Sequence, residues 1–243
     1  MNRNTIKLTG LLIGLLLIVS GSAWAQTPKV WITAGAKGGI GGNYLSEPDD
    51  ATWYSGPFED GAGGIGGGGG IFGDVRFLNQ HLGLEVDLLI DANKTWCSFN
   101  DADFILKYAN LRIPVLVKGS VNHGNTRLGL GIGPEFRVGL NADTDIEAPD
   151  FWPQSNVDAL KEQFTAKKRN DVALAWELAF GFAVKRVEIT LDVRFSYNLT
   201  LPKEYLDRLN YNSDSETSDG VEAGHTVDAR ILLGVGYVFT AGE

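Results

Sequence analysis

Residues 82–91 read Leu-Gly-Leu-Glu-Val-Asp-Leu-Leu-Ile-Asp, and this stretch decides the fold because its apolar residues recur at every second position. One face of an extended chain would carry Leu82, Leu84, Val86, Leu88 and Ile90, and the opposite face Gly83, Glu85, Asp87 and Asp91. Successive side chains of a β-strand point to opposite faces, so the alternation predicts a strand with one apolar and one polar face.

The same alternation recurs in seven other segments. They are residues 30–40, 71–77, 111–117, 128–138, 172–183, 187–199 and 227–239. Their connections alternate between long and short, with the tight turns at 79–81, 119–126 and 185–186. This loop pattern is typical of transmembrane barrels. We therefore predict an all-β fold, an eight-stranded antiparallel up-and-down transmembrane β-barrel with short periplasmic turns and long outer loops.

The N-terminus has the pattern of an export signal. Residues 1–25 hold a basic start, an apolar run from Leu8 to Val19, and the small-residue motif Ala23-Trp24-Ala25. A retained anchor helix is the alternative, but the run is shorter than the ~20 residues that span a bilayer. We expect a cleaved signal peptide at 1–25, a barrel domain at 26–243, and localisation in the bacterial outer membrane. One cysteine excludes a disulfide scaffold, and a net charge of −9 argues against nucleic-acid binding.

Charged residues share the polar face of the predicted strands with glycine and alanine. A soluble barrel would turn this face to water, whereas a narrow closed lumen favours small residues beside arginines and carboxylates that can pair. Aromatic residues near both ends of the apolar face indicate two membrane interfaces. The predicted lumen charge network comprises Lys37, Asp74, Arg76, Glu85, Asp87, Arg112, Glu135, Arg137, Glu177, Glu188, Asp192, Arg194, Asp228 and Arg230. An eight-stranded lumen is just wide enough for side chains to fill, so we expect a plug without large-solute porin activity.

Three segments resemble a known family. They read Tyr-Ala-Asn-Leu-Arg-Ile-Pro-Val-Leu-Val-Lys-Gly at 108–119, Leu-Gly-Ile-Gly-Pro-Glu-Phe-Arg-Val-Gly-Leu at 130–140, and Leu-Asp-Val-Arg-Phe-Ser-Tyr-Asn-Leu-Thr at 191–200. Together they resemble the PorT-type outer-membrane β-barrel family and, more distantly, the OmpA and OmpX barrels. The resemblance implies a barrel in the outer membrane and a link to protein secretion, and it implies no catalytic residues.

Two motifs with possible chemistry favour a structural interpretation. Gly64, Gly66 and Gly69 match G-x-G-x-x-G, but a dinucleotide site needs a preceding strand and a following helix, whereas here a strand follows. We interpret the glycine tract 61–70 as a flexible loop entering the second strand. His225, near Asp228, is the one histidine expected on the loop side, and no nucleophile stands at a recognisable spacing. We expect no cofactor, no metal and no enzymatic activity. A hydrolase or acyltransferase with its site at the loop-side rim is the remaining alternative.

The predicted outer loops contain aromatic residues and a candidate helix at 157–168. Trp53, Tyr54, Trp96 and Trp152 are candidate ligand-binding aromatics, but we favour the alternative that they pack the loops against one another, because such loops need a core of their own. The sequence thus predicts a monomeric, non-enzymatic outer-membrane barrel with a filled lumen, which contacts outer-membrane lipid and presents loops for surface interaction or envelope integrity. The alternatives are an accessory of transport or protein secretion, with envelope secretion components as partners, and a small-solute pore.

Overall fold

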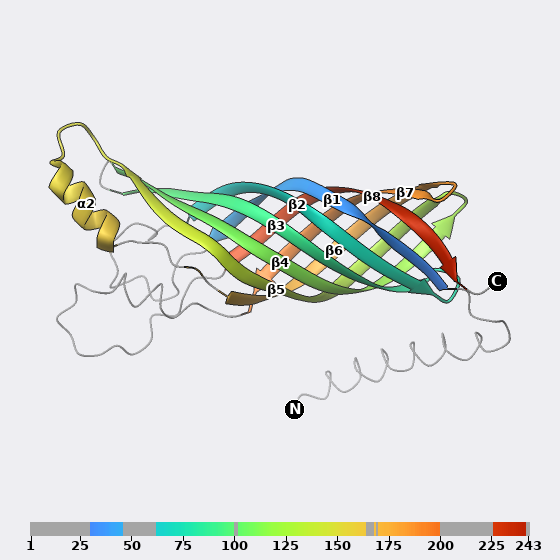
Figure 1. The fold of residues 1–243 in the computed structure, drawn as a ribbon. Coiled ribbons are helices and arrows are strands. Elements are labelled where there is room, and N and C mark those ends of the chain that lie inside the picture. The colour runs from blue at the N-terminus through green and yellow to red at the C-terminus, as the bar shows by residue number, and fades with distance from the viewer. Residues whose placement is uncertain are drawn as a thin grey trace, which may run out of the picture.

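The computed structural model describes residues 30–45, 62–99, 102–163, 168, 170–199 and 226–241. They form eight strands and one helix (Figure 1). The elements are β1 (Val30–Leu45), β2 (Ala62–Phe77), β3 (Leu82–Phe99), β4 (Ala102–His123), β5 (Thr126–Glu147), α2 (Gln154–Gln163), β6 (Asn170–Val184), β7 (Val187–Asn198) and β8 (Thr226–Ala241). The predicted leader at 1–25 lies outside the described residues. No helix within the described residues is long and apolar enough to cross a membrane.

The strands form a closed barrel in sequence order, and each pairs with its neighbours in antiparallel fashion. The ring is closed by β1 and β8, whose paired residues run from Val30 opposite Ala241 to Leu45 opposite Thr226. The tight turns between β2 and β3, β4 and β5, and β6 and β7 gather at one end of the barrel, and the connection from β5 to α2 lies at the other (Figure 1). We call these the turn end and the loop end. The predicted eight-stranded up-and-down barrel is confirmed.

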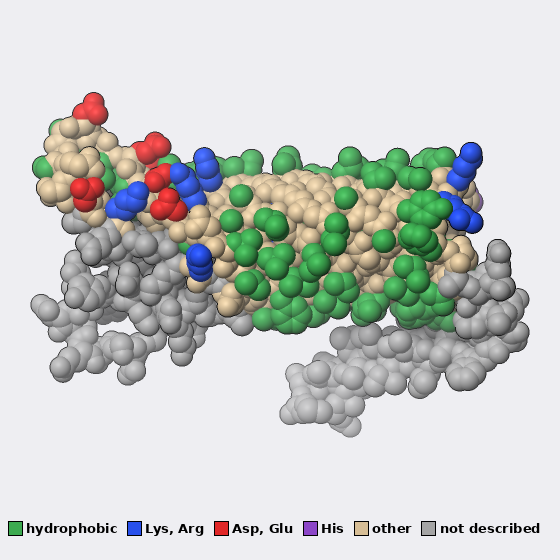
Figure 2. Space-filling view, viewed as in Figure 1, with side chains coloured by type: hydrophobic (Ala, Val, Ile, Leu, Met, Phe, Trp, Pro, Cys, Tyr) green, Lys and Arg blue, Asp and Glu red, His purple; other side chains and the backbone are tan. Residues whose placement is uncertain are grey.

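The exterior is apolar along all eight strands. Large side chains such as Ile40, Leu130 and Leu233 are more than half exposed, and Figure 2 shows apolar side chains over much of the barrel wall. Among the described residues, no exposed charged side chain lies on the barrel wall between the turns and Lys94 on β3. A soluble monomer rarely exposes contiguous apolar patches beyond a few hundred Å². This surface is therefore built to face lipid.

Several strands extend further than their apolar alternation indicated. The tract 62–70, which we interpreted as a flexible loop, belongs to β2 and pairs with both β1 and β3. The interpretation was wrong because glycines have no side chains whose alternation could reveal a strand, whereas their backbone groups form the hydrogen bonds of a sheet like those of any other residue. Similarly, residues 92–99 and 102–110 form a hairpin of β3 and β4 in place of a loop. The helix begins at Gln154, three residues before the predicted start.

A β-bulge changes which side chains of β5 point inward. Ala109 of β4 lies opposite Asn141 and Asn110 opposite Gly139, so Leu140 is the extra residue. Before the bulge the odd-numbered residues are buried, as at Glu135. Beyond it the even-numbered residues turn inward, with Thr144 buried and Ala142 and Ile146 partly buried. The inner side of this extension holds a small apolar cluster. Its members are Ala62, Ala102, Phe104 and Leu106, with Tyr108, Ala142, Ile146, Ala148 and Trp152 packed against them.

A backbone hydrogen bond joins each tight turn to a strand that the turn does not itself connect: the β2–β3 turn to β4, the β4–β5 turn to β6, and the β6–β7 turn to β8. Ser120 N of β4 donates to His81 O at 2.8 Å, Ala183 N of β6 donates to Asn125 O at 2.8 Å, and Val238 N of β8 donates to Arg186 O at 2.7 Å. These bonds continue the sheet into the turns, so the turn end is a hydrogen-bonded rim.

Candidate functional site

The inward-facing charges form three clusters along the barrel axis. The turn-end cluster contains Asp74, Arg76, Arg127 and Glu188. The central cluster contains Lys37, Glu85, Asp87, Lys118, Glu177, Asp192 and Arg194. The loop-end cluster contains Asp91, Arg112, Glu135, Arg137, Asp228 and Arg230. The exposed fraction is below 9% for every one of these residues, so their charges pair with one another away from water.

Two arginines hold the turn-end cluster together. Arg76 Nε donates to Asp74 Oδ2 at 2.7 Å, Arg76 also pairs with Glu188, and its Nη2 donates to Thr33 Oγ1 at 2.5 Å. Arg127 joins the same two carboxylates, with Nη1 3.1 Å from Asp74 Oδ2 and Nη2 2.7 Å from Glu188 Oε1. This cluster, with two charges of each sign, connects β1, β2, β5 and β7.

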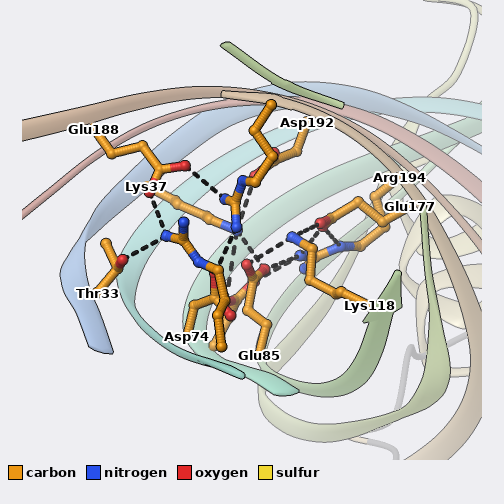
Figure 3. Close-up of polar contacts among 12 residues, drawn as sticks. Thr33, Lys37, Asp74, Glu85, Lys118, Glu177, Glu188, Asp192 and Arg194 are labelled. Atoms are coloured by element: carbon orange, nitrogen blue, oxygen red, sulfur yellow. Dashed lines mark hydrogen bonds and ion pairs between the residues drawn. The ribbon is translucent and has the colours of Figure 1, made fainter. Parts of the chain in front are cut away.

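The central cluster spans five strands (Figure 3). Lys37 Nζ of β1 lies 2.5 Å from Glu85 Oε1 and 2.8 Å from Asp192 Oδ2. Lys118 Nζ lies 2.8 Å from Glu85 Oε2 and 2.5 Å from Glu177 Oε1. Each carboxylate oxygen named here is thus held by a cation that the chain itself supplies.

Arg194 completes this cluster from β7. Its Nε donates to Glu177 Oε2 at 2.9 Å, and its Nη2 donates to Asp87 Oδ2 at 2.7 Å. The cluster contains four carboxylates and three cations. Oxygens of Glu85, Glu177 and Asp192 lie within 4.8 Å of one another, as in a metal site. Two lysine ammonium groups already lie among these oxygens, so the donor set does not favour a resident metal ion.

In the loop-end cluster, three arginines alternate with three carboxylates. Arg112 Nη2 lies 2.6 Å from Glu135 Oε1 and 3.2 Å from Asp228 Oδ2. Arg137 Nη2 lies 2.7 Å from Asp228 Oδ2, and Arg230 Nη2 lies 2.5 Å from Asp91 Oδ2. Asn93 continues the network, since its Oδ1 accepts a hydrogen bond from Arg230 at 3.0 Å.

Glycines on the inner wall leave room for these side chains. A Cβ added at Gly181 would lie 2.7 Å from Glu188 Oε1, and one at Gly41 would lie 2.6 Å from Arg230 Cγ. At Gly234 it would lie 2.4 Å from Thr190 Oγ1 and 3.0 Å from Lys37 Cγ. Real Cβ atoms do not approach other atoms this closely, so alanine at these positions would push the charged side chains aside.

All fourteen residues of the predicted lumen network are buried and ion-paired. Sequence reasoning missed Asp91, Lys118 and Arg127 as members, and all three lie on the buried face. Alternation alone could have found them. Lys118 lies an even number of residues from Arg112, and Arg127 an even number from Glu135, so each shares the inward face of its strand. The predicted strands, however, ended one residue short of Lys118 and of Arg127.

The predicted loop aromatics do not form one site within the described residues. Trp96 lies on β3, half exposed, so its assignment to a loop was wrong, because the β3–β4 hairpin continues past it. Trp152 packs against the apolar cluster of Ala62, Ala102, Phe104 and Leu106, which supports the packing interpretation for that residue. Trp53, Tyr54 and His225 lie outside the described residues.

Comparisons with known proteins show the fold. No family model and no curated protein matches the chain. The outer-membrane protein OprG from Pseudomonas aeruginosa is similar in structure, with a TM-score of 0.50, 14% identity, and coverage of 89% of this chain and 98% of that one. Other matches are Neisserial surface protein A, with a TM-score of 0.40, 10% identity and coverage of 86% and 97%, and Ail of Yersinia pestis, with 0.37, 13%, and 88% and 100%. The likeness to OprG therefore shows that the chain has the fold of an outer-membrane β-barrel, while the resemblance to the PorT-type family stays a prediction.

Proposed function

We propose that the protein is a non-enzymatic barrel of the outer membrane whose lumen is closed by ion pairs and whose loop end is presented for surface interaction or envelope integrity. The three charge clusters carry this proposal, because together they contain residues of all eight strands. The lipid-facing exterior supports the membrane location. At the loop end, β3, β4 and β5 extend beyond the other strands of the barrel (Figure 1).

A permeating solute would have to separate buried ion pairs in each cluster. Removing one partner from a buried pair costs roughly 3–5 kcal/mol, because the remaining charge is left uncompensated. Several such pairs lie in series, and Arg194 alone contacts Glu85, Asp87 and Glu177. The lumen therefore acts as a plug.

Planar-bilayer recording tests the plug with the full-length protein. We expect no stable conductance from the native chain. The double variant Arg194→Ala/Glu177→Ala removes one charge of each sign and two long side chains, so it should create a measurable conductance. The control Leu178→Ala/Leu191→Ala changes two outward-facing residues of the same strands. A large, stable conductance from the native protein would overturn the proposal.

The loop end offers a surface for recognition. Phe151, between β5 and α2, is 77% exposed, whereas its neighbour Trp152 packs into the apolar cluster. An exposed aromatic on an anchored segment is typical of residues that dominate interfaces. With the barrel in the outer membrane and its loop end outside the cell, protease added to intact cells should cleave near α2. Cell fractionation should recover the protein with the outer membranes. Recovery in the soluble periplasm would sink this proposal.

A second candidate is an accessory of protein secretion, which rests on the resemblance of residues 108–119, 130–140 and 191–200 to the PorT-type family. Such an accessory would engage envelope components through its turn end. Crosslinkers placed at Asn79 and Asn125 should then capture secretion components, whereas crosslinkers at Phe151 should not. The opposite pattern would favour loop-mediated surface interaction.

A further inference from the structure

Three polar atoms of the loop-end cluster form no hydrogen bond with the part of the chain that the structure describes. They are the donors Arg112 Nη1 and Arg230 Nε and the acceptor Asp91 Oδ1. Their side chains are at most 6% exposed, so bulk water does not satisfy them. Buried polar groups nearly always have a partner in protein, ordered water or an ion, because an unpaired group has lost its hydration without compensation. These atoms therefore indicate a bound ligand.

The three side chains meet at the Asp91 carboxylate. Its Oδ2 accepts hydrogen bonds from Arg230 Nη2 and Asn93 Nδ2, both at 2.5 Å. Arg112 Nη1 lies 3.7 Å from the same oxygen. This separation is too long for a direct hydrogen bond, and it is the separation across which a bridging molecule is expected. The bridge would reach Asp91 through Oδ1, the oxygen that accepts no hydrogen bond from the described residues.

Arg112 is held away from Asp91 by its other contacts. Its Nε donates to Glu135 Oε1 at 2.8 Å, and its Nη2 donates to Asp228 Oδ2 at 3.2 Å. A guanidinium is planar and rigid, so two fixed nitrogens also fix the direction of the third. The gap between Arg112 Nη1 and Asp91 is thus built into the cluster.

The mixture of donors and acceptors at this gap selects the ligand. An anion would be attracted to the guanidinium groups of Arg112 and Arg230 but repelled by Asp91, and a cation would meet the opposite conflict. Water both donates and accepts, so it satisfies both kinds of group. Internal waters typically make about three hydrogen bonds, and Arg230 Nε is a further donor in the same cluster.

We propose that a water molecule bound in the lumen bridges Arg112 and Asp91. It accepts a hydrogen bond from Arg112 Nη1 and donates one to Asp91 Oδ1, so each atom gains a partner. The loop-end cluster is then a hydrated layer of the plug. A dry plug would close the lumen equally well, so this proposal and the closed lumen fail independently: conductance tests the lumen, and diffraction tests the water.

X-ray diffraction from crystals of the full-length protein, at a resolution that shows ordered water, tests the site. We expect a single density peak at about 2.7–3.2 Å from both Arg112 Nη1 and Asp91 Oδ1. Glu177 is the control within the same lumen, because its two oxygens accept hydrogen bonds directly from Lys118 and Arg194. No water should bridge Glu177 to either cation. Direct contact between Arg112 Nη1 and Asp91, without a peak between them, would overturn the proposal.

Anomalous diffraction distinguishes water from an ion at the same position. One set of crystals is grown with bromide in place of chloride, and another with rubidium in place of sodium. Both ions scatter anomalously, whereas water does not. We expect no anomalous peak between Arg112 and Asp91 in either set. Such a peak would identify an anion or a cation and would rule out the water.

The variant Asp91→Glu tests whether the gap determines binding. Its side chain is longer by one methylene, so the carboxylate should contact Arg112 Nη1 directly and displace the water. The control Asp192→Glu lengthens a carboxylate of the central cluster and should keep the peak at Asp91. Heat-modifiable migration on gels shows whether each variant is folded, and the native crystals decide the question even where a variant is not. A peak that persists unchanged in folded Asp91→Glu would contradict the proposed bridge.

Discussion

The ammonium group of Lys37 lies 4.7 Å from the centroid of the Phe72 ring, inside the lumen. Phe72 is only 5% exposed and belongs to the polar, inward face of β2. The ring fits because Gly35 and Gly236 lie beside it, where an added Cβ would approach its edge to 2.7 and 2.9 Å. A cation over a buried aromatic face adds an attraction that the ion pairs of Lys37 do not provide.

Gly236→Ala should destabilise the barrel by about 1–3 kcal/mol through overpacking. Its Cβ would lie 2.6 Å from Thr33 Cγ2 as well as 2.9 Å from Phe72 Cζ. The matched control is Gly73→Ala on the opposite, outward face of β2, where nothing lies within 4 Å of the new Cβ. Urea unfolding in detergent micelles, followed by tryptophan fluorescence, compares the two. Equal effects would mean that the space around Phe72 is not tightly packed.

Lys37→Met should cost more stability than Asp192→Asn. The first change leaves four carboxylates facing two cations, and the loss of a buried partner costs roughly 3–5 kcal/mol. The second change brings the central cluster to three charges of each sign. Asp192 contacts one cation of the cluster, Lys37, within the described structure. The free energies of unfolding of both variants decide the matter, and a larger loss for Asp192→Asn would contradict the charge count.

Alternation at 82–91 and 187–199 was sufficient to predict the barrel, because a lipid-facing wall and a filled lumen impose period 2 on every strand. The same constraint placed the fourteen charged residues on one face. The prediction from alternation failed where residues have no side chain and where the side chains of a strand change direction. The glycine tract 62–70 shows no period, and the extra residue Leu140 reverses the parity of β5. Which charges pair could not be predicted, since it depends on distances across the barrel between residues such as Lys37 and Glu85.

Trp152→Ala should loosen the loop end without unfolding the barrel. Trp152 packs against the cluster of Ala62, Ala102, Phe104 and Leu106, which lies apart from the three charge clusters. We expect faster proteolysis near α2 and an unchanged urea midpoint for the barrel. Phe151→Ala is the control, because the side chain of Phe151 is exposed and lies next to Trp152 in the sequence. A lower midpoint in Trp152→Ala would show that the extension and the barrel unfold together.

The partly exposed carboxylate of Asp145 should titrate at low pH. It accepts hydrogen bonds from Lys107 and, at 3.3 Å, from Lys161 Nζ, and these bonds hold the pKa of Asp145 below its ordinary value. The pair contributes stability above the pKa of the unfolded carboxyl, and this contribution is lost as the pH falls through the lowered pKa. Lys107→Gln should therefore raise the pKa of Asp145, as measured by NMR titration. Lys94→Gln, which removes a lysine that does not contact Asp145, should leave it unchanged.

The pairing of β1 with β8 also has a consequence in time. These strands, residues 30–45 and 226–241, come from opposite ends of the described chain, and their pairing closes the ring. Until the final strand has been synthesised and exported, the edge of β1 has no partner and the lumen charges have one open side. Closure of the ring must therefore wait for residues 226–241. Contacts so distant in sequence form slowly, so the nascent protein needs protection from aggregation during that interval.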